Sequence, residues 1–141
     1  MDVGSIMTVG SIMTARVVTV EMDDRLEVVK QIFDTLKFHH LLVIDDRRKL
    51  IGIVSDRDLL KALSPHLGSA AETARDIATL DKRVHQIMSR KPLTLRPQAA
   101  VTEAVALFMG NRISCIPIVN DEFHPVGVLS WRDVMRSLFQ G

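Results

Sequence analysis

The stretch GIVSDRDLL, residues 52–60, returns as GVLSWRDVM at residues 127–135, so one nine-residue pattern occurs twice in the chain. The same offset of 75 residues aligns Thr19 with Thr94 without a gap. An internal repeat at a fixed period indicates two copies of one supersecondary unit, neither of which buries its apolar face alone. The sequence therefore predicts two similar halves that pack on each other.

The composition is that of a folded globular protein, with 141 residues of which 47% are hydrophobic. The net charge of +1 gives no electrostatic reason to expect nucleic-acid or anionic-membrane binding. The single cysteine, Cys115, excludes an internal disulfide framework. No apolar run approaches the roughly 20 residues of a membrane span, and no signal-peptide pattern is visible. We therefore expect a cytoplasmic protein without nucleic-acid or membrane partners.

The first repeat predicts the element order β-α-β-β-α from its apolar periodicity and its turns. Asp24-x-x-Glu27 resembles a capping box at the start of a helix. A charged turn separates two apolar runs, as in a hairpin. The predicted elements are a strand at 17–20, a helix at 26–36, strands at 41–45 and 49–55, and a helix at 56–63.

The second repeat predicts the same order, and a connecting segment joins it to the first. Ser69-x-x-Glu72 resembles a capping box that opens a connecting helix. The elements expected in the second repeat are a strand at 93–95, a helix at 101–108, strands at 115–119 and 126–130, and a helix through Phe139. The resulting division is an extension at 1–8, repeat 1 at 9–63, a connection at 64–83 and repeat 2 at 84–141.

The beginning of the chain carries VGSIMT twice, at 3–8 and at 9–14, and only the second copy fits the 75-residue register. We therefore interpret residues 1–8 as lying outside the repeat, with Met7 as the natural first residue. A genuine short extension is the alternative.

The repeated Ser-x-Arg-Asp has two interpretations. Ser followed three residues later by Asp, where a strand passes into a helix, is a capping box. Arg57 and Arg132, however, fall in the first helical turn, where the helix dipole disfavours a cation unless an anion binds beside it. Backbone N–H groups, a serine hydroxyl and a guanidinium suit a phosphate, and a nearby carboxylate suits the hydroxyls of a ribose. The second interpretation is therefore a nucleotide site.

The two units open with Ile-Met-Thr or Ile-Met-Ser, continue through a Val-x-Thr-Val type strand and end in Gly-x-x-Ser-x-x-Asp. In these motifs the chain resembles a tandem pair of CBS (cystathionine β-synthase) domains. The match covers residues 12–60 and 87–135. The resemblance implies an α+β fold in which two β-α-β-β-α repeats pack sheet to sheet about a pseudo-twofold axis. It also implies two clefts for adenosine-containing ligands, and assembly into a homodimer.

The resemblance also implies roles for individual residues. Asp58 and Asp133 match ribose-binding positions, and Ser55 and Ser130 match phosphate-facing positions. Thr19 and Thr94, with the backbone near Ile116 and Pro117, match positions that line the adenine pocket. The copies differ at Leu42, where the second has Pro117, and at Asp45, where the second has Asn120. The expected ligand-binding residues are Ser55, Arg57, Asp58, Ser130, Arg132, Asp133, Thr19, Thr94, Ile116 and Pro117.

The implied function is a regulatory module that senses energy or metabolite state by binding AMP, ADP or ATP, with NAD and S-adenosylmethionine as further candidates. Its output would pass through an effector protein that the sequence does not identify, and no cofactor is required. A ligand-free module that acts by dimerisation is the alternative, and a hydrolase is the least favoured class. Apolar residues on the two repeat-ending helices exceed what a short helix buries internally, which predicts a contact surface.

Other candidate sites are weaker. His39-His40 lacks the spacing of a metal site, so a core or edge role is favoured. Cys115 has no neighbouring base and is interpreted as a small buried hydrophobe. No nucleophile and base can be assembled, so no enzyme activity is predicted. Asp56, where the second repeat has Trp131, is expected to oppose a phosphate or to stabilise the helix start.

Overall fold

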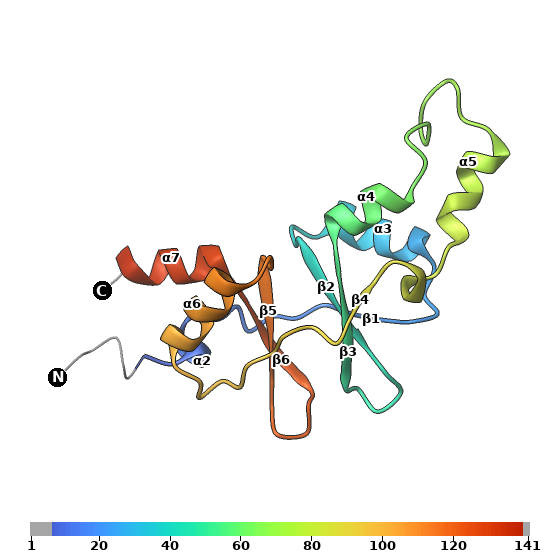
Figure 1. Ribbon diagram of the computed structural model, residues 1–141. Coiled ribbons are helices and arrows are strands. Elements are labelled where there is room, and N and C mark those ends of the chain that lie inside the picture. Colours follow the sequence, from blue (N-terminus) through green and yellow to red (C-terminus); the bar gives the residue numbers. More distant parts are fainter. Residues whose placement is uncertain (1–6, 140–141) are drawn as a thin grey trace. The chain divides into compact units, whose positions relative to one another are not determined.

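The computed structural model describes residues 7–139, so residues 1–6 of the expected extension lie outside it. The chain forms two units, each built on the sheet of one repeat (Figure 1). The repeat-1 unit contains residues 18–47 and 51–91. The repeat-2 unit contains the described residues up to Val17, residues 48–50 and the chain from Pro92 onward. Each unit therefore includes the opening segment of the other repeat.

A four-stranded sheet forms the repeat-1 unit, in the order β1 (Thr19–Glu21), β2 (His40–Ile44), β3 (Leu50–Ser55) and β4 (Ser89–Arg90). β1 is parallel to β2, and β4 is antiparallel to β3. Helices α3 (Leu26–Thr35) and α4 (Asp56–Ala62) pack against each other. The buried core combines these elements with the start of repeat 2 and contains Val20, Leu26, Val29, Leu41, Val43, Val54, Leu59, Val84 and Met88.

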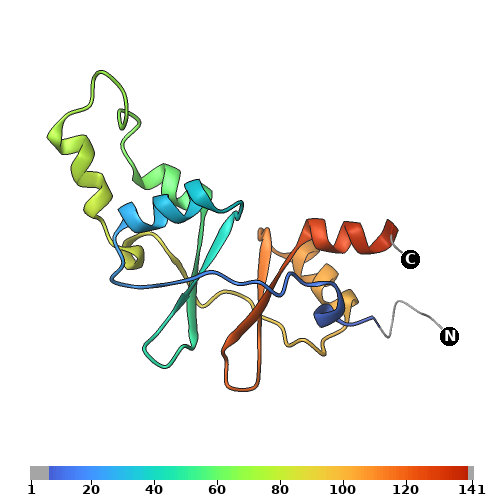
Figure 2. The same ribbon diagram turned by 180° about the vertical axis from the view of Figure 1, so that it is seen from behind.

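The repeat-2 unit contains an antiparallel hairpin of β5 (Cys115–Val119) and β6 (Pro125–Ser130). Helix α7 (Trp131–Phe139) contacts α6 (Val101–Gly110) and the short α2 (Val9–Ile12), and Figures 1 and 2 show all three beside the hairpin. The buried core contains Val9, Val101, Ala104, Ile116, Ile118, Leu129 and Val134. The α+β class with two repeats of this kind is thus confirmed. None of the described helices is long and apolar enough to span a membrane.

Individual backbone hydrogen bonds also recur in the two repeats. Val9 N donates to Ala99 O at 2.8 Å, and Val84 N, 75 residues later, donates to Asp24 O at 2.9 Å. The carbonyl of Met7 also accepts a bond of this repeated pattern. The hydrogen-bonded part of the repeat therefore includes Met7 and the residue after it.

The prediction of a strand at 93–95 is wrong, because only Leu95 forms a β-bridge there. In repeat 1, Leu42 N donates to Val18 O at 3.0 Å and so lengthens the pairing of β1 with β2. The equivalent position in repeat 2 is Pro117, which has no N–H to donate. One ladder bond is therefore lost, and the first strand of repeat 2 shrinks to one residue.

The capping box expected at Asp24-x-x-Glu27 is also wrong. Arg25 is the N-cap of α3 and its side chain makes no capping bond. The Asp24 carboxylate instead accepts the Glu21 N–H at 2.8 Å, and Glu27 pairs with Arg25 at 2.7 Å. Both acidic groups are therefore used by nearer partners.

The connecting helix begins later than Ser69-x-x-Glu72 predicts. The Ser69 hydroxyl donates to His66 O, and the Glu72 carboxylate accepts the N–H of Gly68, so these side chains close a turn. The capping box that starts α5 (Ala74–Ala78) is formed by Thr73 and Asp76. A single 3₁₀ turn, η1 (Thr79–Asp81), follows α5.

The hairpin turns of the two repeats use equivalent side chains despite their different sequences. The Asp45 carboxylate accepts the N–H of Arg47 at 2.8 Å, and the Asn120 side-chain oxygen accepts that of Glu122 at 3.1 Å. Both side-chain oxygens close the turn over the backbone two residues on. The difference between Asp45 and Asn120 is therefore explained by a turn that either residue stabilises.

Candidate functional site

Both repeated Ser-x-Arg-Asp motifs lie at a strand-to-helix junction and form capping boxes. Ser55 Oγ accepts the Asp58 N–H at 3.1 Å, while Asp58 Oδ2 accepts the Ser55 N–H at 2.9 Å. Ser130 and Asp133 form the same pair of bonds at 3.2 and 2.9 Å. The structural interpretation of the motif is thus correct. The capping box uses one carboxylate oxygen of each aspartate. A nucleotide would therefore have to be bound by the remaining groups of the motif.

The two junction aspartates differ in their surroundings. Asp133 is only 6% exposed, and its Oδ1 accepts the Thr14 hydroxyl at 3.4 Å. Arg136 lies one helical turn later, with a guanidinium nitrogen 3.7 Å from the same oxygen. Asp58 is half-buried. Thr14 belongs to the opening segment of repeat 1, so the Asp133 carboxylate is oriented by a residue far from it in sequence.

The arginines of the motif project from the same junctions into solvent. Arg57 and Arg132 are the second residues of α4 and α7, and both are exposed. The serines beside them are half-buried. Each junction therefore offers an exposed guanidinium and a serine hydroxyl, which are donors that recognise a phosphate. Helix-start N–H groups are already used, because the Asp58 and Asp133 N–H groups donate to the serine Oγ atoms and the Asp56 N–H donates to His39 O.

The strand residues of the expected site lie near these junctions. In the repeat-2 unit, Cys115 pairs with Ser130, and Pro117 lies two residues further along β5, about 7 Å away at the usual strand rise. Leu95 N donates to Pro117 O at 3.3 Å, which brings the half-buried Thr94 to the same strand. Ile116 and Pro117 are buried, so their backbone rather than their side chains is the part suited to ligand contact.

The corresponding position in repeat 1 is more open. Thr19 is exposed and stands opposite Leu42 in the parallel register of β1 and β2. Ser55 ends β3, the strand beside β2. Thr19 and Ser55 therefore belong to one sheet, on strands that β2 separates, while Arg57 and Asp58 follow Ser55 on α4.

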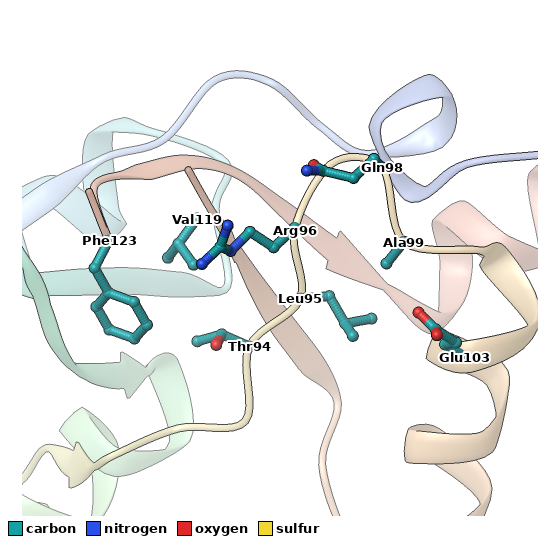
Figure 3. Close-up of a pocket in the computed structure, with 8 residues that line it drawn as sticks. All are labelled: Thr94, Leu95, Arg96, Gln98, Ala99, Glu103, Val119 and Phe123. Carbon is teal, nitrogen blue, oxygen red and sulfur yellow. The ribbon is translucent and has the colours of Figure 1, made fainter. Parts of the chain in front are cut away.

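A pocket of about 470 Å³ lies at the other end of the repeat-2 hairpin (Figure 3). Val119, which lines it, pairs with Pro125, whereas the Ser130 junction is at the opposite end of β5. Arg96, on its wall, forms an ion pair with Asp121. Of the expected site residues only Thr94 lines this pocket, whose lining consists of Thr94, Leu95, Arg96, Gln98, Ala99, Glu103, Val119 and Phe123.

The sequence analysis missed the contact that His39 makes with Asp56. The Asp56 N–H donates to His39 O at 3.0 Å, and His39 Nδ1 lies 3.0 Å from Asp56 Oδ2. Burial acts to raise the pKa of Asp56, but the hydrogen bond and charge of His39, with smaller contributions from the Arg57 N–H and His40, hold it below its usual value. Asp56 thus pairs with a histidine at the junction. No group of three metal-ligating side chains occurs among residues 7–139.

Cys115 is half-buried next to the repeat-2 junction, and burial, with a smaller contribution from the Asp133 charge, raises the pKa of its thiol to about 12. The thiolate is the reactive form, so the folded protein should react with a disulfide reagent such as DTNB at pH 8 at least about 100-fold more slowly than the denatured chain. Absorbance of the released thiolate measures both rates. Equal rates would contradict the burial of this thiol.

The chain as a whole is similar to known proteins in sequence and in fold. A family model for the CBS domain matches residues 9–65 and 84–140. An uncharacterized protein of Methanocaldococcus jannaschii is 26% identical over 157 residues, covering 96% of this chain and 93% of that protein. Inosine-5'-monophosphate dehydrogenase of the same organism is 27% identical over 120 residues, covering 85% of this chain and 21% of the enzyme. The crystal structure of CBSX2 in complex with AMP, a protein of Arabidopsis thaliana, has a TM-score of 0.77 at 28% identity, covering 94% of this chain and 96% of that chain.

Proposed function

The chain belongs to the CBS domain family, and from this premise we propose that it is a regulatory module that binds adenine nucleotides and acts through a partner protein. The observation that carries the proposal is the similarity, over nearly the full length of both chains, to a CBS pair solved in complex with AMP. The proposed role is binding rather than catalysis. We place it in the cytoplasm, in keeping with a single cysteine that has no internal partner for a disulfide.

The proposed binding mode places one nucleotide site at each junction. Ser55 and Arg57 in repeat 1, and Ser130 and Arg132 in repeat 2, would donate to the phosphate. Asp58 and Asp133 would accept hydrogen bonds from the ribose hydroxyls. The adenine would lie along the strands that carry Thr19 in one repeat, and Thr94 with the Ile116-Pro117 backbone in the other.

Isothermal titration calorimetry with AMP, ADP and ATP tests the proposal. We expect heat of binding with at least one of them, and stronger binding than with NAD or S-adenosylmethionine. Absence of heat with every adenosine ligand would favour the second candidate, a ligand-free module that acts by protein contact.

The observation that favours a protein contact is the apolar surface of α7. Leu138 and Phe139 are 69% and 82% exposed, and Met135 is 42% exposed. Leu59 and Val134 are among the apolar residues of the two repeat-ending helices that predicted a contact surface, but both are buried in the cores. Exposed apolar side chains that cluster on one helix commonly mark a contact surface, and we propose that a second copy of this chain covers this one.

Replacing Leu138 with aspartate should therefore convert a homodimer into a monomer, because a charge cannot be buried unpaired in the contact. Light scattering should report twice the 15.8 kDa chain mass for the unmodified protein and once that mass for the variant. Ile77→Asp is the matched control, since Ile77 is an equally apolar side chain, 50% exposed, on α5. An unmodified protein that is monomeric at micromolar concentration would contradict the dimer.

A further inference from the structure

The pocket at the turn end of the repeat-2 hairpin lies away from the Ser130 junction, and the proposed nucleotide binding does not use it beyond the shared Thr94 (Figure 3). Its volume of about 470 Å³ is in the range of pockets that hold small molecules. Phe123 gives it an aromatic wall, whereas Arg96 and Glu103 bring opposite charges to it. The lining therefore combines apolar contact with charge.

Backbone hydrogen bonds hold the lining in place. Val119 N donates to Leu95 O and Ala99 N donates to Arg96 O, both at 3.0 Å. The first bond joins β5 to the segment before α6, and the second closes a turn within that segment. The pocket is thus largely preformed, which lowers the cost of ordering it around a ligand.

The hairpin turn places the ring of Phe123 on the pocket wall. The φ of Phe123 is 63°, in the left-handed region that glycine and asparagine usually occupy, and its carbonyl accepts the Leu50 N–H at 3.0 Å. Arg48, the equivalent residue of repeat 1, has a φ of 64°. The turn therefore imposes this backbone in both repeats, but it carries an aromatic ring in the second alone.

The charged side chains of the pocket differ in how they are paired. Arg96 forms an ion pair with Asp121, whose side chain is 76% exposed. Within residues 7–139, the side chains of Gln98 and Glu103 make no hydrogen bond or ion pair. Figure 3 shows Arg96 and Glu103 on opposite sides of Leu95. An apolar side chain thus separates a weakly held cation from an anion that no protein group neutralises.

The repeated fold does not require these groups. The positions of Arg96, Glu103 and Phe123 all carry different chemistry in repeat 1, where the equivalent residues are Glu21, Val28 and Arg48. The same backbone arrangement therefore forms without a cation, an anion and a ring at these three places. Their combination in repeat 2 calls for an explanation other than folding.

We propose that this pocket binds a small zwitterion in which an apolar body separates a carboxylate from a protonated amine, as in a dipeptide. Arg96 binds the carboxylate through its planar fork and exchanges Asp121 for it. Glu103 binds the amine, and the Phe123 ring packs on the apolar body. The proposal is independent of nucleotide binding.

The two charges of the pocket select against simpler ligands. A plain carboxylate would pair with Arg96 but be repelled by Glu103, and a plain amine would meet the reverse. The pair of Arg96 with Asp121 is exposed and hence weak, so a ligand carboxylate can displace it. A zwitterion is the class that pairs both charges at once.

Titration calorimetry with L-leucyl-L-leucine tests the proposal, with N-acetyl-L-leucyl-L-leucinamide as a probe that has the same body and neither charge. We expect the dipeptide to bind with a Kd of about 1 mM or tighter, and the blocked peptide at least about tenfold more weakly. Arg96→Gln and Glu103→Gln should each weaken dipeptide binding by about tenfold. Asp121→Asn should strengthen it about two- to fivefold, because the competing carboxylate is removed.

Arg112→Gln is the matched control, since it replaces an exposed arginine of repeat 2 that does not line the pocket, and it should leave dipeptide binding unchanged. AMP should neither displace the dipeptide nor bind more weakly to Arg96→Gln. No dipeptide binding, equal binding of the blocked peptide, or weaker binding by Asp121→Asn would overturn the zwitterion site. Displacement of the dipeptide by AMP would overturn it as a site separate from the nucleotide.

Discussion

Replacing Gly52 with alanine should destabilise the protein by about 2–3 kcal/mol, although it adds a single methyl group. Gly52 pairs with β4, and a Cβ at this position would lie 2.9 Å from Ser89 O and 3.0 Å from Met88 Sδ. The carbonyl belongs to a paired strand and cannot move without straining the sheet. At this chain length, such a loss should lower the Tm by about 5–10 °C, as measured by circular dichroism.

Gly110→Ala is the matched control for Gly52→Ala. A Cβ at Gly110 would meet no atom within 4 Å, and the residue ends α6, where alanine is the better helix former. We expect an unchanged or slightly higher Tm. Gly127→Ala, the repeat-2 counterpart of Gly52→Ala, should also destabilise the protein, because a Cβ there would lie 2.4 Å from Met13 Sδ and 3.0 Å from Thr14 O, a carbonyl that accepts the Val128 N–H. Equal Tm values for Gly52→Ala and Gly110→Ala would contradict the close packing of Met88 and Ser89 against Gly52.

The second large effect is expected in nucleotide binding. Asp133→Asn should weaken AMP binding by about tenfold, the range of one charge-assisted hydrogen bond, and more than Asp58→Asn does. The Asp133 carboxylate is buried and oriented by Thr14, whereas Asp58 is half-buried beside a second carboxylate, Asp56. A buried, oriented acceptor contributes more per hydrogen bond than a solvated one.

Calorimetry with AMP measures both affinities. The asparagine side-chain oxygen can still accept the N–H of the junction serine, so the capping box is expected to persist, and equal Tm values would verify this. Equal losses of affinity, or a larger loss at Asp58, would show that the two junctions are not used in the proposed way.

Much of the fold could be predicted from the sequence because many of its elements depend on residues that lie close together along the chain. The alternation of apolar runs and turns predicted the hairpin of β2 and β3, and the helix α6, close to their observed bounds. Ser-x-x-Asp predicted the capping boxes at both junctions. These features depend on residues within a few positions of one another, so periodicity and spacing are enough to reveal them.

Tertiary structure decided the features that depend on distant partners. The opening segment of each repeat joins the unit of the other, which explains why the motif begins with glycine and how Thr14 reaches Asp133. The pairing of His39 with Asp56 likewise joins a strand start to a helix start. Residues of this kind carry no periodic signal, because their roles arise only when hydrogen bonds and packing bring separate segments together. The sequence alone therefore determined the repeat and its motif, while the folded chain determined which side chains surround each copy.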